Sequence, residues 1–252
     1  MRIEILGTPF NGLGVFPDIE NPAEGLRQLG LITRLNARGH IVTDLGDLSG
    51  FLCQDIRDPV TGINDFDLWL DLSREISHFL VGIFDRQAFP LILGGDCRML
   101  VGIYAALSQR QTEAGLIFLD GHGDFHSPET SPGGDPADME LAILTGRGPE
   151  RITRIAGKYP LLKDEAVVVY GIRAWDGIAA SNIKVYDRQR MLENGIKHAV
   201  KDGLKNISQN ELPVWLHFDV DVLDPEFMPA MFPDPEGLTF EEAQELLGIV
   251  WG

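Results

Sequence analysis

The stretch GLIFLDGHGD, residues 115–124, joins a continuous apolar run to a segment of glycine, aspartate and histidine. A short apolar run that ends at glycine and aspartate is typical of a β-strand buried on both faces. Strands of this kind occur in parallel sheets that helices cover on both sides. The stretch therefore predicts a central strand of an α/β fold, with polar side chains at the carboxyl end of that strand.

The same order of strand, polar junction and helix recurs along the chain. Besides 115–120, strands are expected over residues 2–6, 40–44, 90–93, 166–170, 183–186 and 214–219. Helices are expected over residues 23–38, 65–87, 98–109, 139–145, 189–206 and 239–247. Strands that alternate with helices favour a doubly wound α/β domain, whose functional site lies at the carboxyl ends of the strands. Because no repeat or long linker divides the sequence, one domain is expected over residues 1–252.

The composition excludes several classes of protein. A hydrophobic content of 44% is enough for a buried core, which excludes a disordered chain. Acidic residues outnumber basic ones by 38 to 21, and the resulting net charge of −17 repels nucleic acids and anionic membranes. The N-terminus does not read as a signal peptide, and no window holds the roughly 18 apolar residues of a transmembrane helix. These features predict a cytoplasmic protein that binds neither nucleic acid nor membrane.

Three of the expected strand ends carry side chains that bind metal ions. They read GGDC at residues 94–97, DGHGD at residues 120–124 and DVDVLDP at residues 219–225. Side chains alternate between the faces of an extended segment, so Asp120, His122 and Asp124 are expected on one side. Asp219 and Asp221 are expected to share a side in the same way. Four carboxylates held together would repel each other, and a divalent cation removes this cost.

Each motif alone is also compatible with a polar turn, but two such motifs after buried strands favour a metal site. Oxygen ligands with one imidazole suit Mn²⁺ better than a structural zinc ion, which prefers cysteine and histidine. Four carboxylates are enough to be shared between two ions. Two ions about 3.5–4 Å apart would hold a bridging water and lower its pKa, which supplies hydroxide at neutral pH.

The three strand ends resemble the signatures of the ureohydrolase family, which includes arginase, agmatinase and formimidoylglutamase. The family signatures are a Gly-Gly-Asp-His end, an Asp-Ala-His-x-Asp end and a Ser-x-Asp-x-Asp-x-x-Asp-Pro end, in that order. The similarity covers nearly the whole chain and also includes residues 7–10, 30–31, 44–47, 229–230 and 237–239. It implies a three-layer αβα fold around a mostly parallel sheet, and assembly into a homo-oligomer, a trimer or hexamer.

The resemblance also implies hydrolysis of a C–N bond in a small guanidino or formimino compound, at a site with two Mn²⁺ ions. The positions that match the family's metal ligands are Cys97, Asp120, His122, Asp124, Asp219 and Asp221. Asp120 and Asp219 would bridge the two ions. Cys97 and Asp124 would complete the ligands of one ion, and His122 and Asp221 would complete those of the other. A hydroxide between the ions would attack the substrate carbon, and Asp124 would act as the catalytic residue that orients it.

Cys97 stands where the family usually has a histidine ligand, and this departure leaves three interpretations open. Cys97 is a true ligand in a variant subgroup, a non-ligand beside a weakened or single metal, or the mark of an inactive homologue. A thiolate favours zinc, iron or another late metal more than it favours manganese. His217 replaces a small serine of the family. A role as hydrogen-bond partner of an aspartate, or as a core histidine, is favoured there over direct metal ligation.

The loop over residues 125–138 and the end of the chain also depart from the family. The family's loop histidine, a proton shuttle and substrate contact, is absent, because its place is taken by the segment Ala137-Asp138-Met139. His126 in the same loop is a candidate substrate-binding residue, and a solvated loop histidine is the alternative. The sequence ends just after the last expected helix, so either it is truncated or the family's final strand and its guanidinium-binding glutamate are absent. These departures keep open a second function, a catalytically impaired ligand-binding or assembly subunit.

Overall fold

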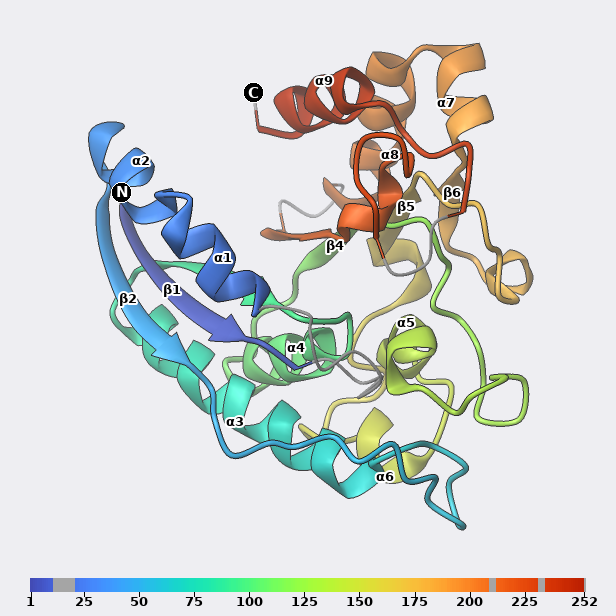
Figure 1. Cartoon of the computed structure of the whole chain (residues 1–252). Coiled ribbons are helices and arrows are strands. Elements are labelled where there is room, and N and C mark those ends of the chain that lie inside the picture. Colours follow the sequence, from blue (N-terminus) through green and yellow to red (C-terminus); the bar gives the residue numbers. More distant parts are fainter. Residues whose placement is uncertain (11–20, 209–211, 231–233, 252) are drawn as a thin grey trace.

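The seven expected strands are all present in the computed structural model, which describes residues 1–10, 21–208, 212–230 and 234–251 (Figure 1). The strands are β1 (Arg2–Thr8), β2 (Ile41–Asp47), β3 (Phe89–Gly94), β4 (Gly115–Leu119), β5 (Val167–Tyr170), β6 (Lys184–Tyr186) and β7 (Val214–Phe218). Every pairing between neighbouring strands is parallel. The predicted α/β class, with parallel strands between helical layers, is confirmed.

The strands form two sheets rather than the single sheet that the sequence predicts. One sheet has the order β2-β1-β3 and the other the order β6-β5-β4-β7. No pairing joins β3 to β7 within the described residues, so each is an edge strand. The two sheets nevertheless meet where these strands end, because the sulfur of Cys97, just after β3, lies 3.4 Å from Nε2 of His217 on β7. The order of strands depends on contacts between distant parts of the chain, and a local apolar pattern does not encode it.

Nine helices connect the strands within the described ranges. They are α1 (Pro22–Gln28), α2 (Leu31–Ala37), α3 (Phe66–Asp85), α4 (Met99–Gln109), α5 (Glu140–Leu144), α6 (Glu150–Thr153), α7 (Arg188–Asn194), α8 (Ile196–Ser208) and α9 (Phe240–Trp251). Two expected long helices are each divided in two at a glycine in the left-handed region, Gly30 with φ 82° and Gly195 with φ 80°. Glycine adopts this conformation without steric cost, and a helix ends where it does. None of the described helices is long and apolar enough to cross a membrane.

The alternation of side chains along β4 shows the three layers. Leu116 and Phe118 belong to a core shared with α3 and α4 on one face of the sheet. Ile117 and Leu119 belong to a second core, shared with α7, α8 and α9 on the other face. All four side chains are buried, as the continuous apolar run predicts. The carboxyl end of β4 is therefore enclosed on both sides, and the polar residues that follow it enter the interior of the protein.

Buried polar contacts fix the turn from β3 into α4. The guanidinium of Arg98 is 2% exposed, and its Nε donates to Oδ1 of Asp96 at 2.8 Å. The indole Nε1 of Trp69 on α3 donates to the carbonyl oxygen of Arg98 at 3.0 Å. Together these bonds hold the side chain of Cys97 toward the ends of β4 and β7.

Candidate metal centre

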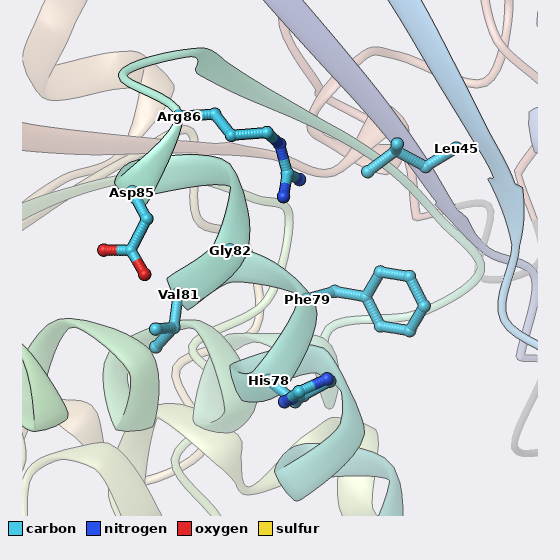
Figure 2. Close-up of a pocket in the computed structure, with 7 residues that line it drawn as sticks. All are labelled: Leu45, His78, Phe79, Val81, Gly82, Asp85 and Arg86. Carbon is cyan, nitrogen blue, oxygen red and sulfur yellow. The ribbon is translucent and has the colours of Figure 1, made fainter.

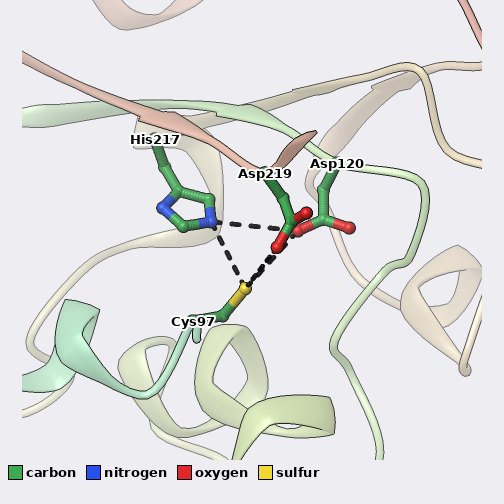
Figure 3. Close-up of side chains that lie close together, drawn as sticks. All are labelled: Cys97, Asp120, His217 and Asp219. Atoms are coloured by element: carbon green, nitrogen blue, oxygen red, sulfur yellow. Dashed lines mark hydrogen bonds and ion pairs between the residues drawn. The ribbon is translucent and has the colours of Figure 1, made fainter. Parts of the chain in front are cut away.

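The ends of β3, β4 and β7 bring four side chains into one cluster, Cys97, Asp120, His217 and Asp219 (Figure 3). The sulfur of Cys97 lies 3.4 Å from Oδ2 of Asp219 and 3.7 Å from Oδ2 of Asp120. Four possible ligand atoms, one from each residue, all lie within 4.8 Å of one another. Three of the four residues are buried, and Asp219 is partly buried. The predicted meeting of Cys97 with the two aspartates is present in the structure.

His217 lies closer to the centre than its sequence pattern indicates. Its ring stacks on Phe118 at a centroid distance of 4.8 Å, and its Nε2 lies 3.8 Å from Oδ2 of Asp120. Burial lowers the pKa of His217 to about 4, so the imidazole is neutral at physiological pH and one ring nitrogen can accept a hydrogen bond or bind a metal ion. The position of His217 is compatible with a contact to Asp120 and also with direct binding of a metal ion.

A second cluster shares Asp120 with the first and adds His122 and Asp221. Nδ1 of His122 lies 3.0 Å from Oδ2 of Asp221 and 3.6 Å from Oδ1 of Asp120. Burial opposes protonation of His122, but its hydrogen bonds with these two aspartates outweigh burial and raise its pKa to about 11. A metal ion would compete with this proton for the imidazole. Because Asp120 belongs to both clusters, it is placed as a bridging ligand would be.

A third cluster contains Cys97, Asp124 and Glu140, whose ligand atoms also lie within 4.8 Å of one another. Glu140 is the first residue of α5, and its side chain is completely buried. Its hydrogen-bonding neighbour is the carboxyl of Asp124, and no basic side chain among the described residues forms an ion pair with it. Glu140 lies outside the motifs at the three strand ends, and its one local signal is an acid at the start of the apolar segment MELAIL, which does not by itself place it at the centre.

The backbone explains how the acids of each motif are divided between the clusters. Asp124 has a φ of 45°, in the left-handed region, so the segment after β4 is not extended to its end. Its carboxylate therefore joins the cluster of Cys97 rather than that of His122. Asp219 caps a 3₁₀ turn over Val220–Val222, and its Oδ1 accepts from the backbone N–H of Asp221 at 2.8 Å. This turn places the two aspartates of the third strand end in different clusters.

Arg173 and Gly121 fix the third strand end against the second. Nη2 of Arg173 donates to the carbonyl oxygen of Asp221 at 2.6 Å, and Nη1 donates to that of Val222 at 3.3 Å. A Cβ atom at position 121 would lie 2.5 Å from Nη2 of Arg173, so a larger residue there would require the guanidinium to shift. The backbone N–H of Gly121 donates to Oδ1 of Asp221 at 3.0 Å. Arg173 thus holds the backbone of the centre.

The electrostatics of the centre favour a bound cation. Burial, with repulsion between the acids, raises the pKa values of Asp120, Asp124 and Glu140 well above their usual range. Burial and the charge of Asp221 raise the pKa of Asp219 to about 6. A divalent cation would reverse these shifts, because it stabilises the ionised carboxylates. The buried acids, which lack basic partners, and the neutral imidazole of His217 fit such an ion.

Two loop residues lie outside the three clusters. Nε2 of His126 lies 3.2 Å from Oδ1 of Asp176, and its Nδ1 lies 3.3 Å from Oγ1 of Thr130. Asp138, in the segment that matches the family's loop histidine, accepts from Oγ of Ser131 at 2.8 Å. His126 is therefore neither free nor part of the predicted ligand set, and its contact with substrate stays a prediction.

A pocket of about 520 Å³ lies away from the clusters, between α3 and β2 (Figure 2). Its lining includes Leu45, His78, Phe79 and Arg86. None of the residues that line it is a predicted metal ligand. It is therefore separate from the candidate centre.

Comparison with known proteins gives an independent line of support. The model of a family described as "Arginase family" matches residues 1–251. The chain is 30% identical over 259 residues to an arginase of Staphylococcus aureus, with 98% of this chain and 84% of that protein covered. A solved arginase structure from Bacillus caldovelox matches with a TM-score of 0.90 at 27% identity, covering 98% of this chain and 85% of that one. Formimidoylglutamase from Bacillus subtilis, at 17% identity and a TM-score of 0.69, shares the fold over 99% of this chain and 74% of its own.

Proposed function

The chain belongs to the arginase family, and from this premise we propose that it is a metal-dependent hydrolase of a C–N bond in a small guanidino or formimino compound. The observation that carries the proposal is the shared position of Asp120. It lies both in the cluster of Cys97 and in the cluster of His122, so one carboxylate can contact two ions. Two adjacent ions are the arrangement that hydrolytic sites use to activate water.

The proposed ligands are divided between two ions. Cys97 and Asp124 would hold one ion, and His122 and Asp221 the other. Asp120 lies in the clusters of both, whereas Asp219, also expected to bridge the ions, lies only in the cluster of Cys97. We propose Mn²⁺ for both positions, with a more thiophilic divalent metal as the alternative at the ion beside Cys97. When bound, the ions would supply Lewis-acid activation of water near neutral pH.

The side chains of the protein would then orient the reactants. The carboxylate of Asp124 is proposed to accept a hydrogen bond from the attacking water and so direct its lone pair toward the substrate carbon. Five buried or partly buried carboxylates surround the centre, and two divalent ions neutralise only four of their charges. The excess negative charge favours a cationic guanidinium or formimino group over a neutral amide. His126, held by Asp176, is proposed to contact the substrate from the loop.

Metal analysis combined with an activity screen tests the proposal. The purified protein should bind two divalent ions per chain, and with Mn²⁺ it should release urea or ammonia from at least one member of a guanidino and formimino panel. Asp120→Asn should lose both metal and activity, because it removes a shared charged ligand. Asp67→Asn, at an exposed residue that pairs with Arg151, is the control and should change neither.

Two outcomes would contradict the proposal in different ways. A protein that neither contains nor takes up a divalent metal would contradict the centre itself. A protein that binds both ions but hydrolyses no member of the panel would instead favour the ligand-binding or assembly subunit. The cytoplasmic location and the trimeric or hexameric assembly also stay predictions. Cell fractionation and light scattering of the purified protein would measure them.

A further inference from the structure

Glu140 is a buried acid whose hydrogen-bonding neighbour is another acid, Asp124. Its side chain is 0% exposed, and no basic side chain among the described residues forms an ion pair with it. Its neighbours on α5, Leu141, Ile143 and Leu144, are also completely buried, so that side of the carboxyl is closed to water. Burying an ionised carboxylate without a basic partner costs several kcal/mol, by a rough general estimate.

Another buried glutamate in the chain has a basic partner that balances its charge. Glu4 on β1 is 3% exposed, and its carboxylate accepts from Nε and Nη2 of Arg86 at 3.0 and 2.7 Å. The polar groups beside Glu140 are instead the carboxyl of Asp124 and the thiol of Cys97. Both are acids, so neither supplies the positive charge that Glu140 needs when it is ionised. A proton held between Glu140 and Asp124 neutralises one of the two acids, so a cation that leaves both ionised must come from outside the chain.

We propose that Glu140 is an additional ligand of the metal ion held by Cys97 and Asp124. This assignment rests on the proposed metal centre and extends it beyond the six residues that the family resemblance supplies. One oxygen of Glu140 lies within 4.8 Å of ligand atoms of both residues, which is short enough for all three to contact a common ion. The ion would have a thiolate and two carboxylates, together with the aspartates shared with the first cluster.

The extra carboxylate has a consequence for the two ions. A site with a thiolate and several carboxylates carries more negative charge than one built around a neutral imidazole. It should therefore hold its ion more tightly than the neighbouring site, which contains His122. The loss of Glu140 should weaken the ion beside Cys97 selectively.

A carboxylate-to-amide exchange tests the assignment. Glu140→Gln keeps the shape of the side chain and removes its charge. Metal content after dialysis should fall from two ions toward one, or the affinity of the weakened site should fall by at least about tenfold. In protein loaded with Co²⁺, the thiolate-to-metal absorption that reports the ion beside Cys97 should weaken at limiting metal. Glu4→Gln is the matched control, since it removes a buried charge far from the centre; it should lower the melting temperature and leave metal binding unchanged.

The outcomes separate Glu140 from the centre as a whole. If wild-type protein binds no divalent metal, the proposed centre fails. If wild-type and Glu140→Gln bind two ions with equal affinity, only the assignment of Glu140 is overturned. Should Glu140→Gln fail to fold, Glu140→Asp decides, because it keeps the charge and shortens the side chain by one methylene. Weaker metal binding by that variant supports ligation, and unchanged binding at both sites overturns it.

Discussion

Cys97 places a sulfur atom at the meeting point of both sheets. Its thiol lies within 3.7 Å of oxygens of Asp120 and Asp219, and burial raises its pKa well above the usual range. Without a metal it therefore stays protonated. Metal coordination deprotonates a thiol, so a bound ion would change both its charge and its chemistry.

The choice of metal should depend on this sulfur. Exchange of Cys97 for histidine should shift preference toward Mn²⁺ over Zn²⁺ or Co²⁺, because imidazole is harder than thiolate. We expect a change of about tenfold or more in the ratio of affinities, measured by competition between metals. Cys97→Ser should abolish the thiolate-to-Co²⁺ absorption band. An unchanged metal preference in the histidine variant would indicate that Cys97 is not a ligand.

Individual residues of the centre could be predicted to an uneven extent. Every one of the six predicted ligand positions lies in at least one of the three clusters, because the motifs follow strands whose ends meet. The alternation of side chains could not predict their division between clusters, since it depends on the left-handed Asp124 and the 3₁₀ turn after Asp219. The family resemblance did assign Asp124 with Cys97 and Asp221 with His122, and the clusters group these residues in the same way. Glu140 could not be placed either, because α5 approaches the centre only through tertiary packing.

At the scale of elements, the strands were more predictable than the helices. A buried strand appears in the sequence as one short, unbroken run of apolar residues. A helix can be interrupted while its apolar residues keep the same spacing on both sides of the break. The breaks at Gly30 and Gly195 illustrate this, since the apolar positions continue on both sides of each glycine. A glycine inside a helical pattern is compatible with both a continuous and a divided helix.

The contact between α8 and β6 predicts a pH dependence of stability. Oδ2 of Asp202 on α8 accepts from Nζ of Lys184 and from the hydroxyl of Tyr186, both at 2.6 Å. These bonds lower the pKa of Asp202 from 3.8 to about 2. A lowered pKa means that the stabilisation is complete above the unfolded value of 3.8 and is lost as the pH falls through about 2.

Asp202→Asn should therefore destabilise the protein at pH 7 by about 0.5–1 kcal/mol, a modest amount because solvent screens this exposed pair. Urea unfolding at pH 7 and at pH 3 measures the effect, and the difference from wild type should be smaller at pH 3. The exposed Asp67→Asn serves as the comparison, with little difference expected at either pH. A difference for Asp202→Asn that grows toward low pH would contradict the assigned contact.

At the scale of the whole molecule, the division into two sheets is the feature that the strand pattern does not reveal. β4 pairs with β5 on one edge and with β7 on the other, so its backbone groups are bonded on both sides. β3 pairs only with β1, and β7 only with β4, within the described residues. The apolar runs of all these strands look alike in the sequence, since burial rather than pairing determines the pattern.

Amide hydrogen exchange should reveal this division. In a parallel edge strand, alternate N–H groups point away from the single neighbour, so half of the amides of β3 and β7 lack a strand partner. These amides should exchange at least about tenfold faster than those of β4, because protection follows the free energy of opening. Mass spectrometry with fragmentation at single residues can measure the alternation. Equal, uniform protection along β3 and β4 would contradict the division.

The distance along the chain between the proposed ligands links folding to the supply of metal. Cys97 and Asp221 are 124 positions apart (221 − 97), and Asp120 lies between them. One ion would join Cys97 to Asp120 and the other would join Asp120 to Asp221, so the two ions would act as a reversible cross-link that only the folded chain can form. By mass action, free metal at about one hundred times its dissociation constant would add about 2.7 kcal/mol of stability per site. In a metal-starved cell, the amount of folded protein would therefore fall together with its activity.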